Sequence, residues 1–124
     1  QASREQHDRL LHGFAAACQQ GDLPALERLL ADDVVNYADG GGKVHAGQIP
    51  VVGSNLVLRL YNKLFKTWYQ DASFEVAQVN GQTAVLVRIH GALRAILDIE
   101  TDADHIVAIR AQVNPDKLAA LMGS

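Results

Sequence analysis

The chain has 124 residues, of which 48% are hydrophobic and 20% are charged, and its formal net charge is −3 at pH 7. This length and composition predict one globular domain with a single hydrophobic core, which should bury roughly two-thirds of the unfolded chain's surface. The slight acidity offers no basic field for phosphates, so we do not expect this domain to contact nucleic acid directly. No apolar run approaches the roughly 20 residues of a membrane span and no signal peptide is recognised, which predicts a cytoplasmic protein without a membrane partner.

Two helices are predicted at the start of the chain. Ser3 and Gln6 form a capping-box pattern, and apolar residues then recur at helical spacing as far as a glycine. Asp22 is placed to cap a second, short helix that ends near Asp32. The apolar stripe of the first helix includes the single cysteine, Cys18, for which we predict a buried and inert thiol.

A strand that begins at Val34 is predicted next, and it leads into three consecutive glycines flanked by opposite charges. We call this segment the glycine loop; it consists of Asp39, Gly40, Gly41, Gly42 and Lys43. Residues 44–46 are the predicted pairing partner of the strand after the chain reverses. Each glycine loses much backbone freedom on ordering, so three together indicate positive φ angles or a close approach by another backbone. We therefore predict that another protein segment docks on this loop.

A third helix is predicted to begin with Ser54 as its cap. Its expected buried side has residues four apart, with two further apolar residues beside them: Leu56, Leu60, Leu64 and Trp68, with Val57 and Tyr61. Such a helix should pack against a sheet.

The rest of the chain is rich in strand patterns, at residues 73–79, 83–90, 93–100 and 105–113. Asn80-Gly81 between the first two is typical of a tight hairpin turn. Helices followed by a meander predict an α+β fold, in which a cone-like curved antiparallel sheet wraps around three N-terminal helices.

Alternation along the predicted strands separates a core face from a mixed face. The core face has Val85, Val87, Ile89, Leu93, Ala95, Leu97 and Ile99, and the mixed face has Leu86, Arg88, Arg94, Ile96 and Asp98. The mixed face is open to two interpretations, a solvated surface or a semi-polar interface, and we prefer the second.

Few residues could carry chemistry. Asp39 is interpreted as a turn residue rather than a general base, and Asp98 as a cross-strand partner of Arg88 or Arg110 rather than a catalytic acid. No histidines and acids share the spacing of metal ligands, and the Gly-Gly-Gly-Lys run lacks the features of a phosphate-binding loop. We predict no catalytic residue, no metal and no cofactor.

The segment Asn114-Pro115-Asp116-Lys117-Leu118 is by itself typical of a strand-to-helix junction. Together with the glycine loop, Pro50-Val51-Val52-Gly53 and Val79-Asn80-Gly81, it resembles a known family over about residues 4–121. The family is the SnoaL-like domain, of nuclear-transport-factor-two-like fold, that forms the C-terminal extension of certain extracytoplasmic-function sigma factors of bacterial RNA polymerase.

The resemblance implies a regulatory role in transcription initiation, with the sigma core regions of the same polypeptide and RNA polymerase as partners. It assigns the partner contacts to two motifs: Asp39, Gly40, Gly41, Gly42 and Lys43, and Asn114, Pro115, Asp116, Lys117 and Leu118. It also implies an interior cavity, and our candidate lining residues are Phe14, Tyr37, Tyr61 and Trp68. Because the chain lacks an initiator methionine, we expect residues 1–124 to be one domain from the C-terminal part of a longer sigma factor.

Two alternatives stay open. Enzymes of this fold, such as isomerases, cyclases and epoxide hydrolases, would require a polar group deep in an otherwise apolar cone. A dimerisation module would require a large apolar interface on the mixed face. A small apolar ligand in the cone and a second copy of the chain are therefore further candidate partners.

Overall fold

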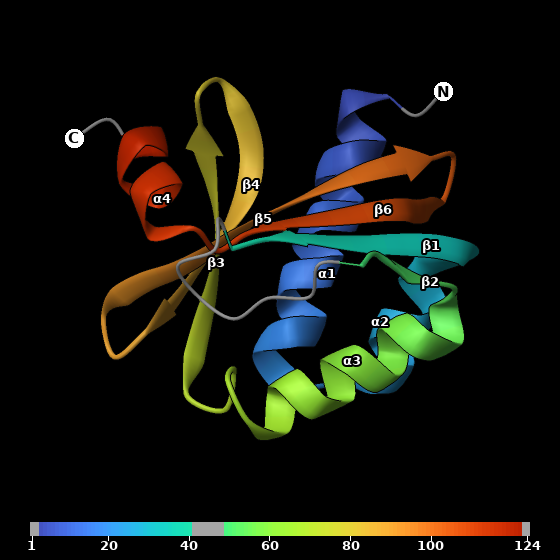
Figure 1. Ribbon diagram of the computed structural model, residues 1–124. Coiled ribbons are helices and arrows are strands. Elements are labelled where there is room, and N and C mark those ends of the chain that lie inside the picture. The colour runs from blue at the N-terminus through green and yellow to red at the C-terminus, as the bar shows by residue number, and fades with distance from the viewer. Residues whose placement is uncertain (1–2, 41–48, 123–124) are drawn as a thin grey trace.

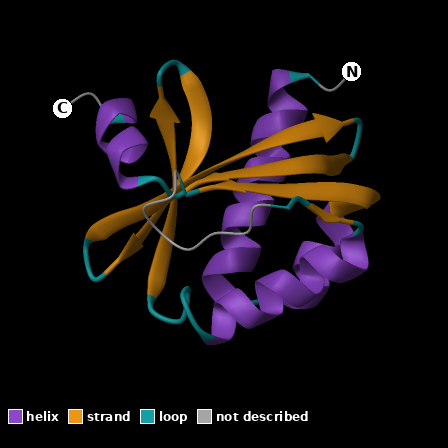
Figure 2. Ribbon diagram, viewed as in Figure 1, coloured by secondary structure: helices purple, strands orange, loops and turns teal. Residues whose placement is uncertain are grey.

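The computed structural model describes residues 3–40 and 49–122 (Figure 1). In chain order the elements are α1 (Arg4–Gln20), α2 (Leu23–Leu29), β1 (Leu30–Asp39), β2 (Val51–Val52), α3 (Ser54–Lys66), β3 (Ala72–Val79), β4 (Gln82–Ile89), β5 (Ala92–Asp102), β6 (His105–Gln112) and α4 (Pro115–Leu121). The predicted α+β class is confirmed, and Figure 2 shows the strands forming one strongly curved sheet.

Local signals set the ends of the first two helices. Ser3 and Gln6 form the predicted capping box at the start of α1, and the helix ends at Gly21 in the left-handed conformation with φ of 62°. The side chain of Asp22 accepts a hydrogen bond from the backbone of Ala25 and caps α2. The second helix ends at Leu29, earlier than expected, because β1 already begins at the next residue.

The sheet is mixed rather than wholly antiparallel, which corrects our prediction. Its strand order is β2-β1-β6-β5-β4-β3, and β1 pairs with β6 in parallel. The chain leaves β1, crosses through α3 and returns by the antiparallel meander, so β6 arrives beside β1 running in the same direction. The Asn80-Gly81 turn is confirmed, with φ of 51° and 79° at the two residues.

The pairing partner of β1 on its other edge is β2, in which Val52 lies opposite Val35. The partner predicted from the sequence, residues 44–46, lies outside the described residues. Gly53 continues the contact by donating its backbone N–H to Val34 at 2.7 Å, and it directly precedes α3.

One face of the sheet, which we call the inner face, packs against α1, α2 and α3. Phe14 from α1 and Tyr61 from α3 meet in this core edge to face, with ring centroids 6.0 Å apart. The Tyr61 hydroxyl donates to Asn36 Oδ1 at 2.9 Å, which satisfies the polar groups of two buried side chains. The fully buried side chains of this region include Leu11, Phe14, Leu26, Val34, Val57, Tyr61, Val85, Val87, Leu97, Ile106 and Ile109.

The buried side of α3 differs from the prediction. Val57 and Tyr61 are its buried residues, whereas Leu56 is 50% exposed and Trp68, beyond the end of the helix, is 70% exposed. Leu60 and Leu64 pack partly buried against the core, so the middle of the expected stripe is confirmed. Trp68 lies beyond Lys66, where helical spacing no longer decides which way its side chain points. The helix also begins without a side-chain cap, since Gly53 rather than Ser54 occupies the capping position.

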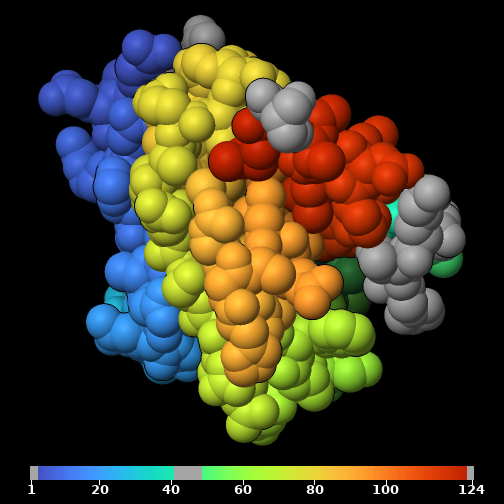
Figure 3. Space-filling view, turned by 90° about the vertical axis from the view of Figure 1, so that its left-hand side faces the viewer, coloured from blue at the N-terminus to red at the C-terminus, as the bar shows by residue number. Residues whose placement is uncertain are grey.

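The opposite, outer face of the sheet is partly covered by α4. Leu118 packs with Ala84, Leu86 and Ile96 in a second, smaller apolar cluster. Figure 3 shows α4 in red, seated against the yellow and orange strands of the sheet. The apolar residues of the predicted mixed face are therefore buried beneath the C-terminal helix of the same chain.

Candidate functional site on the outer face

Asp39, the first residue of the glycine loop and the last residue of β1, contacts the Asn114–Leu118 segment. Lys117 Nζ lies 2.8 Å from Asp39 Oδ2, although the two residues are 78 positions apart. Gln112 Nε2 donates to the same carboxylate oxygen at 3.2 Å, and the backbone N–H of Val113 donates to Asp39 O at 2.9 Å. The parallel pairing of β1 with β6 produces this contact, because Asp39 lies in register with Gln112 just before α4.

Short-range hydrogen bonds set the start of α4. Gln112 Oε1 accepts the backbone N–H of Asn114 at 3.0 Å, and Asn114 Oδ1 accepts the backbone N–H of Asp116 at 3.1 Å. Pro115 then occupies the first helical turn, where its missing N–H costs little. With Leu118 buried below the helix, these contacts orient Lys117 towards Asp39.

The ten motif residues separate by accessibility. Gly40, Asn114 and Leu118 are buried, so they support the site from within. Pro115, Asp116 and Lys117 are exposed, and the side chains of Asp39 and Lys117 are 46% and 58% exposed. Gly41, Gly42 and Lys43 lie outside the described residues. The surface that a partner can reach here therefore includes Asp39, Pro115, Asp116 and Lys117.

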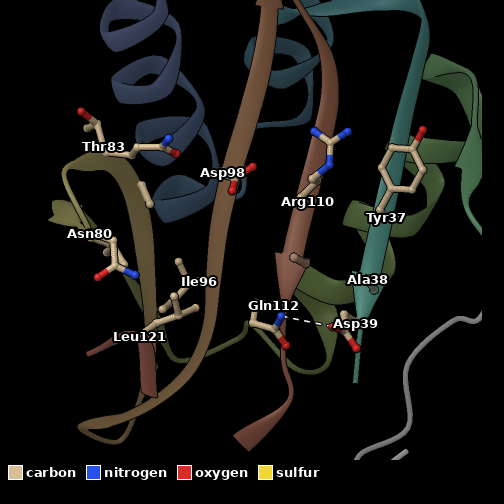
Figure 4. A pocket seen from close by; sticks show the side chains of 14 residues that line it. Tyr37, Ala38, Asp39, Asn80, Thr83, Ile96, Asp98, Arg110, Gln112 and Leu121 are labelled. Atoms are coloured by element: carbon tan, nitrogen blue, oxygen red, sulfur yellow. Dashed lines mark hydrogen bonds between the residues drawn. The ribbon is translucent and has the colours of Figure 1, made fainter. Parts of the chain in front are cut away.

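A pocket of about 500 Å³ adjoins this contact on the outer face (Figure 4). Its walls come from strands β1, β6, β5 and β4 and from the end of β3. The turn after β3 and the last turn of α4 complete them. The lining residues are Tyr37, Ala38, Asp39, Val79, Asn80, Gln82, Thr83, Ala84, Ile96, Asp98, Arg110, Ala111, Gln112 and Leu121.

Arg110 lies opposite Asp98 in the β5–β6 register, as the sequence suggested, but its guanidinium has other partners. It forms an ion pair with Glu100 and lies over the ring of Tyr37, 5.1 Å from the centroid. Arg88, the other predicted partner of Asp98, is paired instead with Glu75 on β3, with 3.9 Å between Arg88 Nε and Glu75 Oε1. Within residues 3–40 and 49–122, the side chain of Asp98 makes no hydrogen bond or ion pair.

The pKa of the Asp98 carboxyl is raised, chiefly because partial burial disfavours its charged form. Arg110 and His7 oppose this shift, and Glu100 adds to it. A raised folded-state pKa stabilises the fold below the unfolded value of about 3.9, and that contribution is lost as pH rises through the folded value.

Replacing Asp98 by asparagine should therefore stabilise the fold at pH 7, because it removes an ionised group from a partly desolvated site. The expected rise in Tm is on the order of a few degrees, and it should vanish near pH 3, where Asp98 is protonated. Thermal unfolding followed by circular dichroism at both pH values measures this difference. A lower Tm for Asp98→Asn at pH 7 would contradict the absence of a favourable partner.

The four residues proposed from the sequence to line a cavity lie in three different environments. Tyr37 lines the outer pocket, Phe14 and Tyr61 are buried in the inner core, and Trp68 is exposed. Sequence reasoning missed Asn80, Thr83 and Gln112 as lining residues. Alternation along the strands had placed Asp98 on the outer face, but nothing in the local pattern indicated that α4 would wall a pocket there.

Neither a metal centre nor a membrane span is found in the part of the chain that the structure describes. No group of three or more His, Cys, Asp and Glu side chains in residues 3–40 and 49–122 is arranged to hold a metal ion. No helix of those residues combines the length and apolar character needed to cross a bilayer.

Comparison with solved structures finds the same fold in several proteins. The Mycobacterium tuberculosis extracytoplasmic function sigma factor SigJ is similar with 25% sequence identity and a TM-score of 0.72, over 91% of this chain and 44% of that one. A SnoaL-like protein of unknown function from Burkholderia thailandensis has 16% identity and a TM-score of 0.68, over 90% of this chain and 97% of that one.

An M. tuberculosis LEH-like epoxide hydrolase has 17% identity and a TM-score of 0.58, over 95% of this chain and 90% of that one. Neither a protein-family model nor a curated protein matches the chain significantly. The chain spans less than half the length of SigJ. It therefore has the SnoaL-like, nuclear-transport-factor-two-like fold, and the resemblance to an extracytoplasmic-function sigma factor that its motifs suggested is confirmed in three dimensions.

Proposed function

We propose that this chain is a regulatory domain that binds the sigma core regions of an extracytoplasmic-function sigma factor in the same polypeptide. By doing so it modulates how those regions engage RNA polymerase, and this role would place it in the cytoplasm. The observation that carries the proposal is the ion pair between Asp39 and Lys117, which joins the two motifs of the family resemblance on one accessible surface. The similarity to SigJ supports it, since the match leaves more than half of that chain uncovered.

The chemistry of this surface suits a polar protein contact. Both charges are about half exposed, and an exposed ion pair contributes only about 0–1 kcal/mol to folding stability. The pair is therefore not required to hold the fold together. A bound partner would cover the ion pair and exclude water from it. The electrostatic interactions of the two charges would then be screened less by solvent and salt, and so would contribute more to binding.

Asp39→Ala and Lys117→Ala are expected each to weaken binding to the sigma core regions by about 1 kcal/mol, a roughly fivefold rise in Kd. Each variant removes one of the two charges of the ion pair. Isothermal titration calorimetry with the isolated sigma core regions measures the effect. Lys66→Ala, an exposed lysine at the end of α3 on the inner side of the sheet, is the matched control and should bind as the unmodified chain does.

Stability separates a binding effect from a folding effect in this experiment. All three variants should unfold within about 0.5 kcal/mol of the parent chain, because each change is on the surface. Undiminished binding by both Asp39→Ala and Lys117→Ala would remove the basis for the proposed site.

The enzyme alternative has less support. Within residues 3–40 and 49–122 the buried polar groups include the amides of Asn36 and Asn114 and the hydroxyl of Tyr61, and no carboxylate or imidazole is among the buried side chains. An amide side chain cannot act as a general acid or base at neutral pH. At 17% identity, the likeness to an epoxide hydrolase supports the fold alone. The interior positions where a small apolar ligand would sit are occupied by Phe14, Tyr61 and Leu97, all fully buried.

The dimer alternative is also weakened by the position of α4. The apolar residues that such an interface would use, Leu86 and Ile96, are only 3% and 6% exposed within one chain. Beside them the outer face is hollowed by the pocket, whose lining includes Asp39, Asp98 and Arg110, and so does not present a broad apolar surface.

A further inference from the structure

The outer pocket contains one carboxylate that forms no ion pair with any residue that the structure describes. Among the described residues that line the pocket, the acidic and basic side chains are Asp39, Asp98 and Arg110. Asp39 is paired with Lys117, and Arg110 is paired with Glu100, so these charges are balanced in place. The Asp98 side chain forms no ion pair or hydrogen bond with any residue of 3–40 and 49–122, although Arg110 is its neighbour in the register.

The position of Asp98 makes this unbalanced charge available to a ligand. Figure 4 shows its carboxylate projecting from β5 into the space between Thr83 and Arg110, on the same side of the sheet as Tyr37. Because the side chain is only partly buried, its oxygens are within reach of a molecule that enters the pocket. Burying a carboxylate without a partner costs free energy, so a bound donor group would relieve an existing penalty.

The rest of the pocket is suited to a small molecule with an apolar body. Its volume of about 500 Å³ falls within the range of small-molecule sites, roughly 300–1,000 Å³. Ile96, Val79 and Leu121 contribute apolar side chains to the lining, and Asn80 and Gln112 contribute amide groups. Leu121 belongs to α4, so a ligand here would touch the helix that carries Lys117.

We propose that this pocket binds a small organic cation, an ammonium, amidinium or guanidinium group on an apolar body, with Asp98 as its counterion. The unbalanced charge of Asp98 selects the positive group, and the apolar end of the pocket receives the body of the molecule. An organic anion is disfavoured, because Asp98 and Asp39 both line the space and Arg110, the cationic side chain among the described lining residues, is paired with Glu100. This site is on the outer face and does not depend on the proposed contact with the sigma core.

Binding of such a cation should strengthen as pH rises through the pKa of Asp98, since only the ionised carboxylate is a counterion. The groups that act on Asp98 are Arg110 from β6, Glu100 from β5 and His7 from α1.

The test is a titration of the whole 124-residue chain with benzamidinium chloride, followed by heteronuclear NMR, with benzyl alcohol as a neutral probe of similar ring size. We expect benzamidinium to shift the resonances of Ile96, Thr83 and Leu121, and we expect benzyl alcohol to bind at least tenfold more weakly. Asp98→Asn should weaken benzamidinium binding at least tenfold. Glu75→Gln, which changes an exposed carboxylate on β3 outside the pocket, should leave it unchanged.

Each contrary result overturns the proposal. Equal affinity of Asp98→Asn and the parent chain would exclude Asp98 as the counterion, and equal affinity for the two probes would exclude selection by charge. Absence of shifts at the pocket residues with benzamidinium would exclude this pocket as a cation site. None of these results would bear on the sigma core contact, which is measured with a different partner.

Discussion

Replacing Phe14 by alanine should lower the free energy of unfolding by about 3–5 kcal/mol, the usual cost of removing a fully buried aromatic side chain. Phe14 is 0% exposed and lies between α1 and α3, in edge-to-face contact with Tyr61. Truncation would leave a void in a region where the surrounding side chains are also fully buried, so little relaxation can fill it. Urea denaturation followed by circular dichroism measures the loss.

Trp68→Ala is the matched comparison, because it removes another aromatic side chain that the sequence had placed at the same cavity. Trp68 is 70% exposed, so its removal should change stability by no more than about 0.5 kcal/mol. A cone that held an open ligand cavity would give a different result, since Phe14→Ala would then enlarge an existing space at small cost. A loss below about 1 kcal/mol for Phe14→Ala would therefore contradict the filled interior.

Replacing Leu118 by alanine should cost about 2–3 kcal/mol of the free energy that holds α4 on the sheet. Leu118 is 6% exposed and belongs to the small apolar cluster with Ala84, Leu86 and Ile96. A helix of 7 residues has little stability of its own, so we expect α4 to detach locally while the inner core stays folded. Detachment would separate Lys117 from Asp39 and remove a wall of the outer pocket.

Amide hydrogen exchange distinguishes this local opening from global unfolding. In Leu118→Ala, exchange should accelerate in α4 and remain slow in β5. Met122→Ala, which truncates a 42% exposed side chain just after the same helix, should leave exchange in α4 near that of the parent chain. Equal acceleration in α4 and β5 would contradict the independence of the two apolar clusters.

The sequence contained enough information for the elements whose causes are local. The capping box at Ser3 and Gln6 and the positive-φ turn at Asn80-Gly81 depend on residues within a few positions of one another. Alternation along β4 and β5 likewise identified the inner face, with Val85, Val87 and Leu97 buried as expected. These signals placed most of the elements and gave the α+β class.

The predictions were wrong where contacts between residues far apart in the sequence decide strand pairing or burial. The residues of β1 and β6 do not indicate that the two strands are parallel neighbours. Their adjacency follows from the path of about 65 residues between them. On α3 the apolar residues extend around more than one face, so only the packing against Phe14 shows that Tyr61 is buried and Leu56 is exposed. Propensity and periodicity alone cannot make that choice.

The candidate site could be predicted in part. The family resemblance singled out the glycine loop and the Asn114–Leu118 segment, and the parallel strand pairing brings Asp39 and Lys117 together. The outer pocket was not predicted, since it exists only because α4 folds back over the mixed face. Leu118 and Leu121 were recognised as apolar residues able to turn back onto the protein, but the face that they cover became apparent only in three dimensions.

Amide hydrogen exchange of the chain, measured with and without the sigma core regions of the same polypeptide, tests the proposed interface most directly. Binding should slow exchange at the end of β1, at Asp39 and Gly40, and across Asp116, Lys117 and the rest of α4. Exchange in α1 and α3, on the inner side of the sheet, should be unchanged. Protection confined to those two helices, or no protection at saturating sigma core, would contradict the interface.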